Sequence, residues 1–349
     1  MRPTLASSAL IVTLGALVLS CSSIGPFNEH EPVHDGEYDS EFPIQPTSKY
    51  LARIAESVLR INSVVYYRTY FFGDNEHITR AMLSDELLQA RVLEAVYNSN
   101  STSGTAVVLF SSGNKIALLT CAHLASFPDT LYAYAIGPDR HATQYLSSVS
   151  VRQRVDLYVA TLPEGGVLDL LCIDKEHDLA VVGKTFGSFQ PMVPQSISYP
   201  LGKAGDLGWG TFLYLFGYPA GNKIVTRGIV SGPNRDRQQS FIVDAVFGRG
   251  FSGGICVALR DGVPHFEIVG MIKSVPAHMS YVLTPGRENT GEDLDLSRPY
   301  KGKMYVDREV DIEYGTSQAV SAETIRQFLS DHRSEIVDGG YQIDALLKN

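Results

Sequence analysis

Short apolar runs bounded by turn-forming residues recur along most of this chain. β-Branched and aromatic residues dominate them, as in "SVVYYRTYFF" at 63–72, and such runs are typical of strands. The similar runs that follow are "TAVVLFSS", "KIALLTCA", "TLYAYAIG", "QYLSSVSVRQRVDLYVATL", "LAVVGK", "TFLYLFGY", "KIVTRGIVSG", "SFIVDAVF", "GICVALR" and "FEIVGMIKS". Many short strands at regular spacing, with Gly, Pro and Asn between them, predict an all-β sandwich or barrel.

Three other segments carry apolar residues at helical spacing, and each begins near a serine that can cap a first turn. They are "SKYLARIAESVLRI" at 48–61, "SDELLQARVLEAVY" at 84–97 and "SAETIRQFLSDHRSEI" at 321–336. In the last one Glu323 follows Ser321 closely, which favours a capped C-terminal helix. The stretch 275–312 is polar and rich in Gly and Pro, so we expect a surface excursion there.

The start of the chain has the pattern of an export signal. Arg2 precedes "LASSALIVTLGALVLS", an apolar run too short to span a bilayer comfortably. The run ends in "VLSC", which resembles the lipobox of bacterial lipoproteins, in which the cysteine is lipidated and becomes the first residue. We therefore expect a signal peptide at 1–20 and a lipidated Cys21, with Ser22 favouring the outer membrane of a diderm bacterium. The alternative is an ordinary signal peptide that is cut nearby.

Residues 21–49 are expected to form a flexible tether, because they are acidic, rich in proline and poor in aliphatic residues. They include "HEPVH" (His30 to His34), which matches the H-E-x-x-H pattern of zinc proteases. That chemistry needs both histidines on one face of a helix, and Pro32 breaks a helix between them. We therefore predict no metal site in this segment.

The composition excludes some classes of function. The chain has 349 residues, of which 44% are hydrophobic, and this is enough for a sizeable core. A net charge of −9 without a Lys/Arg block argues against nucleic acid as a partner. The four cysteines have no C-x-x-C spacing, so neither a zinc site nor a disulfide scaffold is indicated. We expect Cys121, Cys172 and Cys256 to be small core residues.

The stretch "GRGFSGG" at 248–254 matches two motifs at once. Gly248, Gly250 and Gly253 fit the G-x-G-x-x-G dinucleotide fingerprint, and Ser252 lies in a G-x-S-x-G nucleophile elbow. Both motifs require a helix after the turn. Here "GICVALRDG" follows, a strand-like run that ends in a turn, so both assignments are disfavoured and no cofactor is predicted.

Two upstream segments offer a better explanation. "LLTCAHLA" places His123 after an apolar strand, and "DKEHDLAVV" places Asp178 before another. With Ser252 third, the segments resemble the T-A-A-H, D-(L/I)-A and G-(D/N)-S-G-G motifs of chymotrypsin-fold proteases, which have this order. "FGYPAGNKIVTRGIVSG", "VDAVFGRGFSGG" and "SQAVSAETIRQFL" resemble the HtrA/Deg branch of the trypsin-like serine proteases, so the resemblance covers roughly residues 60–333.

The resemblance implies an all-β fold of two six-stranded β-barrels, with short peripheral helices and a C-terminal helix. The domain would span 50–336 and be followed by a tail at 337–349. Because only about a dozen residues follow the last helix, no PDZ domain is expected.

The resemblance also implies roles for particular residues. Ser252 would be the nucleophile, His123 its base and Asp178 the residue that orients the imidazole. The backbone amides of Gly250 and Ser252 would form the oxyanion hole. His177 is a rival base, although its side chain should point away from that of Asp178. The rival acid, Asp174, lacks the apolar run that follows Asp178.

The chain departs from the family pattern near the nucleophile. Phe251 stands where the family usually has Asp or Asn, so activation by pairing a new N-terminus with that acid is not expected. Gly248 and Arg249 replace a typical Asn-Pro, which can loosen the oxyanion loop. The interval from His123 to Asp178 is long for the family, so we expect an extra hairpin there.

The base of the primary specificity pocket is expected at Val246, with Phe247 beside it. Neither offers a carboxylate for a basic side chain, and an unpaired buried cation is costly. This predicts cleavage after apolar residues. Smaller apolar residues are expected if Phe247 fills part of the pocket, and larger ones are expected if Phe247 points into the barrel core.

Together these patterns predict a serine endopeptidase that acts on polypeptides and is anchored in a bacterial cell envelope. The alternatives are an inactive protease-fold scaffold lipoprotein and an esterase. The sequence does not indicate the oligomeric state.

Overall fold

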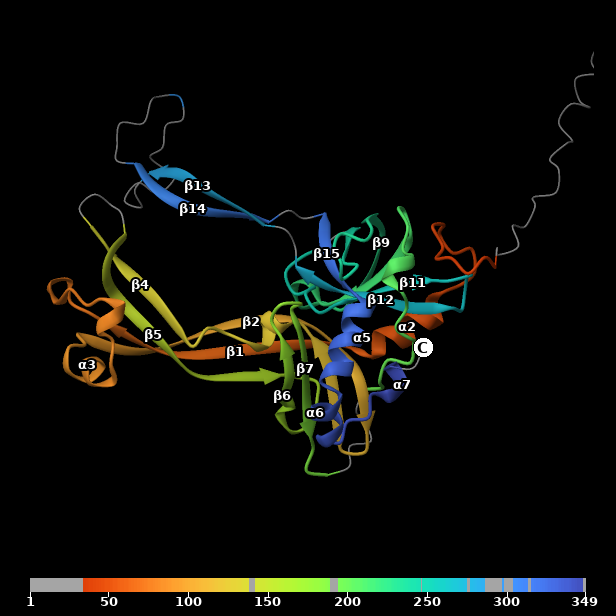
Figure 1. The fold of residues 1–349 in the computed structure, drawn as a ribbon, viewed down its shortest axis with the longest axis horizontal. Helices are drawn as coiled ribbons and strands as arrows, with labels where there is room; N and C mark the ends of the chain where they lie inside the picture. The colour runs from red at the N-terminus through yellow and green to blue at the C-terminus, as the bar shows by residue number, and fades with distance from the viewer. Residues whose placement is uncertain are drawn as a thin grey trace, which may run out of the picture. The chain divides into compact units, whose positions relative to one another are not determined.

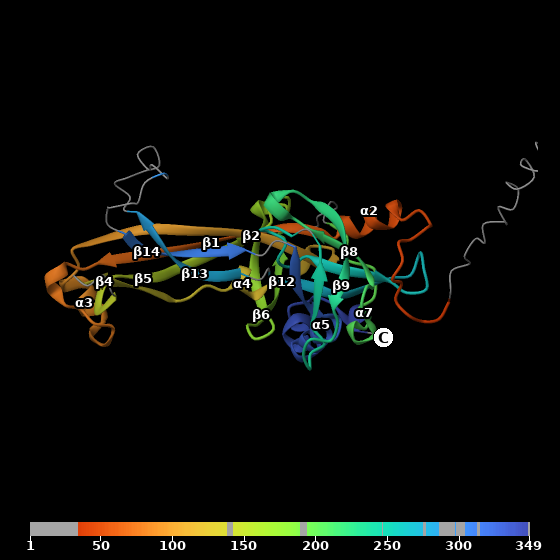
Figure 2. The same ribbon diagram turned by 90° about the horizontal axis from the view of Figure 1, so that it is seen from above.

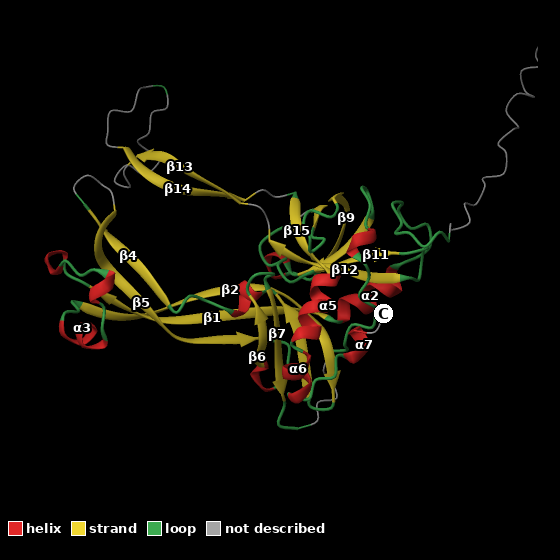
Figure 3. Ribbon diagram, viewed as in Figure 1, coloured by secondary structure: helices red, strands yellow, loops and turns green. Residues whose placement is uncertain are grey.

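The computed structural model describes residues 34–137, 142–188, 194–245, 247–274, 277–285, 297, 304–312 and 315–347. Residues Gly36–Asn349 form one compact unit, and strands make up most of its regular structure (Figure 3). Among the described residues no helix is long and apolar enough to cross a membrane. The predicted signal peptide and Cys21 lie outside the described residues.

The first barrel is an antiparallel sheet that closes on itself. Its strands, in spatial order, are β1 (Val58–Phe71), β2 (Glu94–Ser112), β3 (Lys115–Thr120), β7 (Leu179–Thr185), β6 (Val167–Asp174) and β5 (Ala142–Tyr158). Pairing between β1 and β5 closes the ring, and β4 (Thr130–Ile136) adds to β5 outside it.

The second barrel is also closed and antiparallel. Its spatial order is β10 (Phe241–Asp244), β15 (Thr316–Ser321), β12 (Phe266–Ser274), β11 (Ile255–Leu259), β8 (Phe212–Gly217) and β9 (Ile224–Gly232). The prediction of two six-stranded barrels of the chymotrypsin type is therefore confirmed.

Burial along the strands follows the layers that cover them. β1 alternates between buried and less buried positions, as expected for a strand with one face on a core. β8 and β11 are buried along their whole length, because the barrel interior covers one face and neighbouring elements cover the other. This explains why their sequences are continuous apolar runs.

The C-terminal segment packs against the larger hydrophobic core as short helices, α5 (Ala322–Asp331), α6 (Arg333–Asp338) and α7 (Asp344–Leu347). The Ser321 hydroxyl accepts a hydrogen bond from the Thr324 amide at 3.2 Å, which confirms the predicted N-cap. Glu323 does not complete a capping box. Its carboxylate instead accepts hydrogen bonds from the amides of Ala204 and Gly205.

Two predicted helices are shorter than expected. The first, α2, covers Ser48–Glu56, and β1 begins two residues later. The second, α3, covers Asp85–Ala90, and from Glu94 the chain is strand. Pairing with β1 across an unbroken register overrides the weak helical preference of this segment.

The remaining elements are connections. The stretch 275–312, predicted to be a surface excursion, contains the paired strands β13 (Ala277–Pro285) and β14 (Met304–Ile312). The single-turn 3₁₀ helices are η1 (Asp74–Glu76), η2 (Arg80–Met82), η3 (Glu164–Gly166), η4 (Ala204–Asp206) and η5 (Pro219–Gly221).

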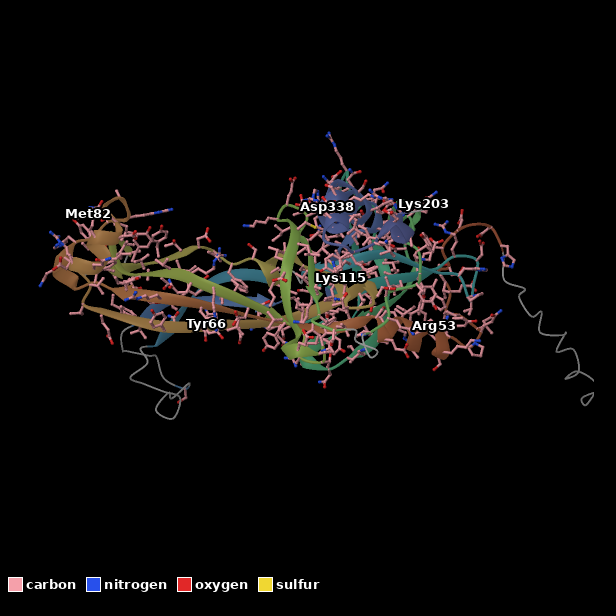
Figure 4. All side chains as sticks on the ribbon, turned by 90° about the horizontal axis from the view of Figure 1, so that it is seen from below. Arg53, Tyr66, Met82, Lys115, Lys203 and Asp338 are labelled. Carbon is pink, nitrogen blue, oxygen red and sulfur yellow. The ribbon has the colours of Figure 1, made fainter. Side chains whose placement is uncertain are left out.

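Beyond the first barrel, the outer parts of β1, β2 and β5 continue as one sheet with β4, and we call this part the arm (Figures 1 and 2). The β4–β5 pair is the hairpin predicted between His123 and Asp178. α3 lies beyond the far end of β1 and β2. A separate small core made of Phe72, Ile78, Leu146 and Val149 stabilises this end. Figure 4 shows Tyr66 along the arm and Met82 at its far end.

Part of the expected tether contacts the second barrel. The amide of Asp39 donates a hydrogen bond to the Leu259 carbonyl at 2.9 Å. Tyr38 is buried, and its hydroxyl donates to Glu267 at 2.6 Å. Burial and the Glu267 carboxylate raise the pKa of Tyr38 above its ordinary value. The tether and domain boundaries at 49 and 336 stay predictions.

Candidate active site

His123 and Asp178 are brought together by two neighbouring strands. His123 lies in the single-turn helix α4 (Ala122–Ala125), which follows β3, and Asp178 immediately precedes β7. These strands are antiparallel partners, so the end of one lies beside the start of the other. His123 Nδ1 lies 2.8 Å from Asp178 Oδ2, and the His123 amide donates to Asp178 Oδ1 at 2.9 Å.

A catalytic base and the acid that orients it would need the arrangement that this pair has. An ionised carboxylate only accepts hydrogen bonds, so Nδ1 is the donor, and in a neutral imidazole Nε2 then presents a lone pair. The His123 side chain is 46% exposed, whereas that of Asp178 is 12% exposed. The carboxylate is therefore held inside while the imidazole can reach a substrate or a nucleophile.

The loop before β7 fixes the position of Asp178. Its backbone has φ of 60°, in the left-handed region that Asp tolerates better than most residues. Its carbonyl accepts a hydrogen bond from the Ala122 amide at 3.1 Å. Of the two rival residues, His177 lies in the same loop and Asp174 ends the strand before it, β6. His177 Nδ1 lies 2.6 Å from Asp174 Oδ2, so the rival base and the rival acid pair with each other.

The loop that carries Ser252 depends on glycine at two positions. Gly250 has φ of +100° and Gly253 has φ of +86°. A Cβ on Gly253 would lie 2.0 Å from the Thr105 carbonyl oxygen, so only glycine fits there. The Phe251 amide donates to the Gly248 carbonyl at 3.1 Å and closes the turn.

Thr105 of β2 holds this loop against the first barrel. Its amide donates to the Ser252 carbonyl at 2.8 Å, and its hydroxyl donates to the Gly250 carbonyl at 2.8 Å. The same hydroxyl accepts a hydrogen bond from the Tyr218 amide at 3.0 Å. The side chain is completely buried. Thr105 thus joins β2 of the first barrel to the loop of the second barrel that carries Ser252, and the sequence contained no signal for this role.

The backbone of Ser252 lies close to the segment after His123. Gly104 separates the two, because a Cβ there would meet Leu124 Cδ1 at 2.2 Å and the Ser252 carbonyl oxygen at 3.0 Å. Within the described residues Ser252 Oγ makes no hydrogen bond, and the amides of Gly250 and Ser252 donate to no carbonyl.

The two phenylalanines of this segment belong to the core of the second barrel. Phe251 is completely buried, and its ring centroid lies 5.3 Å from that of Phe247 in an edge-to-face arrangement. Phe251 therefore fills, with an apolar group, space beneath the loop that carries Ser252. Phe247 therefore points into the barrel core, which is the second of the two orientations considered from the sequence. Val246 lies outside the described residues.

One group among the described residues has the spacing needed to hold a metal ion. Its members are Cys121, His123 and Asp178, and their potential ligand atoms lie within 4.8 Å of one another. The Cys121 thiol instead faces the Ile272 carbonyl at 3.4 Å. Burial and the nearby Asp178 carboxylate raise the pKa of this thiol well above its ordinary value. A thiol must lose its proton to bind a metal, so this group is a poor metal site. The prediction that Cys121, Cys172 and Cys256 are buried is confirmed.

The two closed antiparallel barrels define the class: a chymotrypsin-like fold. Residues 104–271 match the family model described as "Trypsin-like peptidase domain", and this range contains His123, Asp178 and Ser252. This part of the chain, residues 104–271, is therefore similar to a trypsin-like peptidase domain.

Comparison with solved structures and with curated proteins adds little detail. A variant of the HtrA-type protease AlgW with a decapeptide has 15% identity and a TM-score of 0.43, with 85% of this chain and 68% of that chain covered. AlgW with a tripeptide has 15% identity and a TM-score of 0.41, with coverage of 85% and 65%. No curated protein matches this chain.

Proposed function

We propose that this protein is a serine endopeptidase in which Ser252, His123 and Asp178 form the catalytic triad. The observation that carries the proposal is the buried Asp178 carboxylate bound to Nδ1 of a half-exposed His123, in a chain whose residues 104–271 match the trypsin-like peptidase model. The glycine-dependent loop of Ser252, held by Thr105 beside this pair, supports the same assignment.

The proposed reaction has two steps. His123 Nε2 accepts the proton of Ser252 Oγ as the oxygen attacks the carbonyl carbon of a peptide bond. The amides of Gly250 and Ser252 donate to the oxygen anion that forms, and the leaving amine takes the proton back from His123. Water then attacks the acyl-enzyme by the same route and releases the second product. Asp178 keeps the imidazole in one tautomer and stabilises its charged form.

The test is cleavage of an unfolded casein-type substrate by the purified protein. Ser252→Ala and His123→Ala should each lower kcat by roughly 10⁴- to 10⁶-fold, and the double variant should lose little more because the residues act as a unit. Asp178→Asn should cost about 10⁴-fold. His177→Ala is the matched control, because the His177 imidazole pairs with Asp174 and not with Asp178, and it should keep native activity.

Labelling by a fluorophosphonate probe separates the enzyme from the alternatives. Labelling that requires Ser252 supports an active serine hydrolase, and a peptide substrate then distinguishes a peptidase from an esterase. Full peptidase activity in Ser252→Ala would refute the mechanism. Absence of labelling would identify an inactive protease-fold scaffold.

The proposed specificity is for apolar side chains on the acyl side of the cleaved bond. Phe247 is buried in the core, which leaves room in the expected pocket for a residue such as Leu or Met. Burying such a side chain contributes about 1.5–3 kcal/mol, whereas a cation beside Val246 would lack a partner. A peptide-library digest read by mass spectrometry tests this, and dominant cleavage after Lys or Arg would contradict it.

The proposed location is the envelope of a bacterium, on the periplasmic face of the outer membrane if there are two membranes. The proposal rests on the lipobox-like "VLSC" that ends at Cys21. A multiply acylated cysteine anchors a protein stably. Cys21→Ser should move the protein to the soluble fraction and abolish labelling by a fatty-acid analogue. Equal membrane association of both forms would rule out this anchor.

A further inference from the structure

The outer edge of β2 in the arm is an open strand edge. β3 pairs with β2 only from Val107 onward, whereas β1 pairs along the other edge of β2 as far as Glu94. Among the described residues no strand pairs with the outer edge of 94–103. All side chains from Glu94 to Asn100 are exposed, including Tyr97 at 70%.

The direction of the main-chain groups on this edge follows from the ladder. In an antiparallel pair, alternate residues direct both N–H and C=O toward the same neighbouring strand. The Val108 amide donates toward β1, to Ser57, whereas the Thr105 amide donates away from β1, to Ser252. Odd-numbered residues therefore face outward. Within the part of the chain that the structure describes, the outward-facing main-chain groups without a partner belong to Ala95, Tyr97, Ser99, Ser101 and Ser103.

This edge lacks the features that normally protect a strand edge. Proteins block open edges with charged residues, prolines or bulges. Residues 95–105, "AVYNSNSTSGT", contain no charge and no proline, and the register with β1 is unbroken. β4, at the opposite edge of the arm, differs: it is only seven residues long, and its pairing with β5 is irregular at two points.

The open edge is also continuous with the active site. The strand position outside Thr105 is occupied by Ser252 itself, through the hydrogen bond from the Thr105 amide. A chain that leaves Ser252 and runs beside β2 meets Ser103 first and Ala95 last. At about 3.3 Å per residue this track takes about eight residues of an extended strand.

We propose that the outer edge of β2 at 95–103 binds an extended, unstructured polypeptide segment by β-strand addition, and so holds substrate flanking the cleavage site. The inference rests on the proposed peptidase function for its purpose, but the binding itself does not require catalysis. Main-chain pairing suits such a ligand, because it gives affinity without demanding a particular sequence. A second copy of this chain on the same edge would cover the approach to Ser252.

The test measures peptide binding to the full chain carrying Ser252→Ala, by fluorescence anisotropy. A labelled proline-free peptide of about four residues that fits the cleavage site is compared with one extended to about twelve, which spans the track at about 3.3 Å per residue. The long peptide should bind at least about tenfold more tightly, because it gains several main-chain hydrogen bonds that each contribute a net stabilisation. The gain should appear for extension on one side of the cleavage site only.

Two changes address the hydrogen bonds directly. Ser101→Pro removes an outward-facing N–H without touching the ladder to β1, and should abolish the gain from length. Thr130→Pro is the matched control, because the Thr130 N–H also faces outward, at the β4 edge, and this variant should keep the gain. Two further long peptides are N-methylated, one on its odd-numbered residues and the other on its even-numbered residues. Only the peptide whose methylated N–H groups face β2 should lose affinity. Circular dichroism and the Tm of each variant verify the fold.

Equal Kd values for short and long peptides would overturn the inference, as would an equal loss in both proline variants. It would also be overturned if native protein forms a dimer in ultracentrifugation that Ser101→Pro dissociates, since a second copy would then occupy the edge. If long peptides bind in the predicted way but the native chain cleaves none, the docking edge is supported and the proposed peptidase function is refuted.

Discussion

Replacing Thr105 by valine tests how the two barrels are joined at the candidate active site. Valine has nearly the same shape as threonine, so the substitution removes the hydroxyl and leaves no cavity. The Gly250 carbonyl then loses its donor and the Tyr218 amide loses its acceptor, at distances now of 2.8 Å and 3.0 Å. The Thr105 main-chain bond to Ser252 is unaffected.

The cost follows from leaving polar groups unsatisfied in a buried place. An unsatisfied buried group costs about 1–3 kcal/mol, and the Gly250 carbonyl lies in a buried hydrogen bond. The Tyr218 amide is only partly buried and should add less. We expect the free energy of unfolding to fall by about 2–4 kcal/mol in total. Because the Gly250 carbonyl loses its anchor, fluorophosphonate labelling of Ser252 should also slow.

The assay is urea unfolding followed by fluorescence, with the slope m compared between variants to verify that the exposed surface is unchanged. Thr105→Ser is the control, because it keeps the hydroxyl and loses one buried methyl group, at a cost of about 1 kcal/mol. The two hydrogen bonds would not stabilise this junction if the free energy of unfolding of Thr105→Val were within about 0.5 kcal/mol of that of the native protein. The same conclusion would follow if Thr105→Ser were the more destabilising change.

Two further predictions concern titrating groups. Burial, with Glu335 nearby, raises the pKa of Cys172 to about 12, and burial also raises the pKa of Cys121 and Cys256. Iodoacetamide at pH 8 should therefore label none of these thiols until the protein unfolds. Rapid labelling of Cys121 in the native protein, found by peptide mapping, would contradict this. Burial alone would raise the pKa of Asp174, but hydrogen bonds from His177 and Glu176 outweigh it, and the folded pKa lies below the ordinary 3.8. The stability that this carboxylate contributes is therefore complete above about pH 4 and is lost as the pH falls through the folded pKa. The free energy of unfolding of Asp174→Asn should accordingly fall less steeply with decreasing pH than that of the native protein. Identical pH profiles of the two proteins would show that the carboxylate contributes nothing.

Local pattern was sufficient to predict the elements whose identity depends on neighbours in the chain. The apolar runs of β3, β7, β8 and β11 predicted strands, because a strand covered on both faces must be apolar throughout. Ser321 predicted the start of α5, because a cap acts within one turn. The order of the segments around His123, Asp178 and Ser252 indicated the fold by resemblance, and the two barrels confirm that fold.

What the sequence did not reveal depends on partners that are distant along the chain. Residues 94–103 are polar and follow a helical segment, and only their ladder with β1 makes them a strand. The hydroxyl of Thr105 gains its role from Gly250, which is 145 positions away. Phe251 was recognisable as a departure from the family motif, but its place against Phe247 depends on closure of the second barrel. Periodicity records which face of an element is buried, whereas the tertiary structure decides which distant groups meet on that face, because ring closure and register are properties of all the strands together.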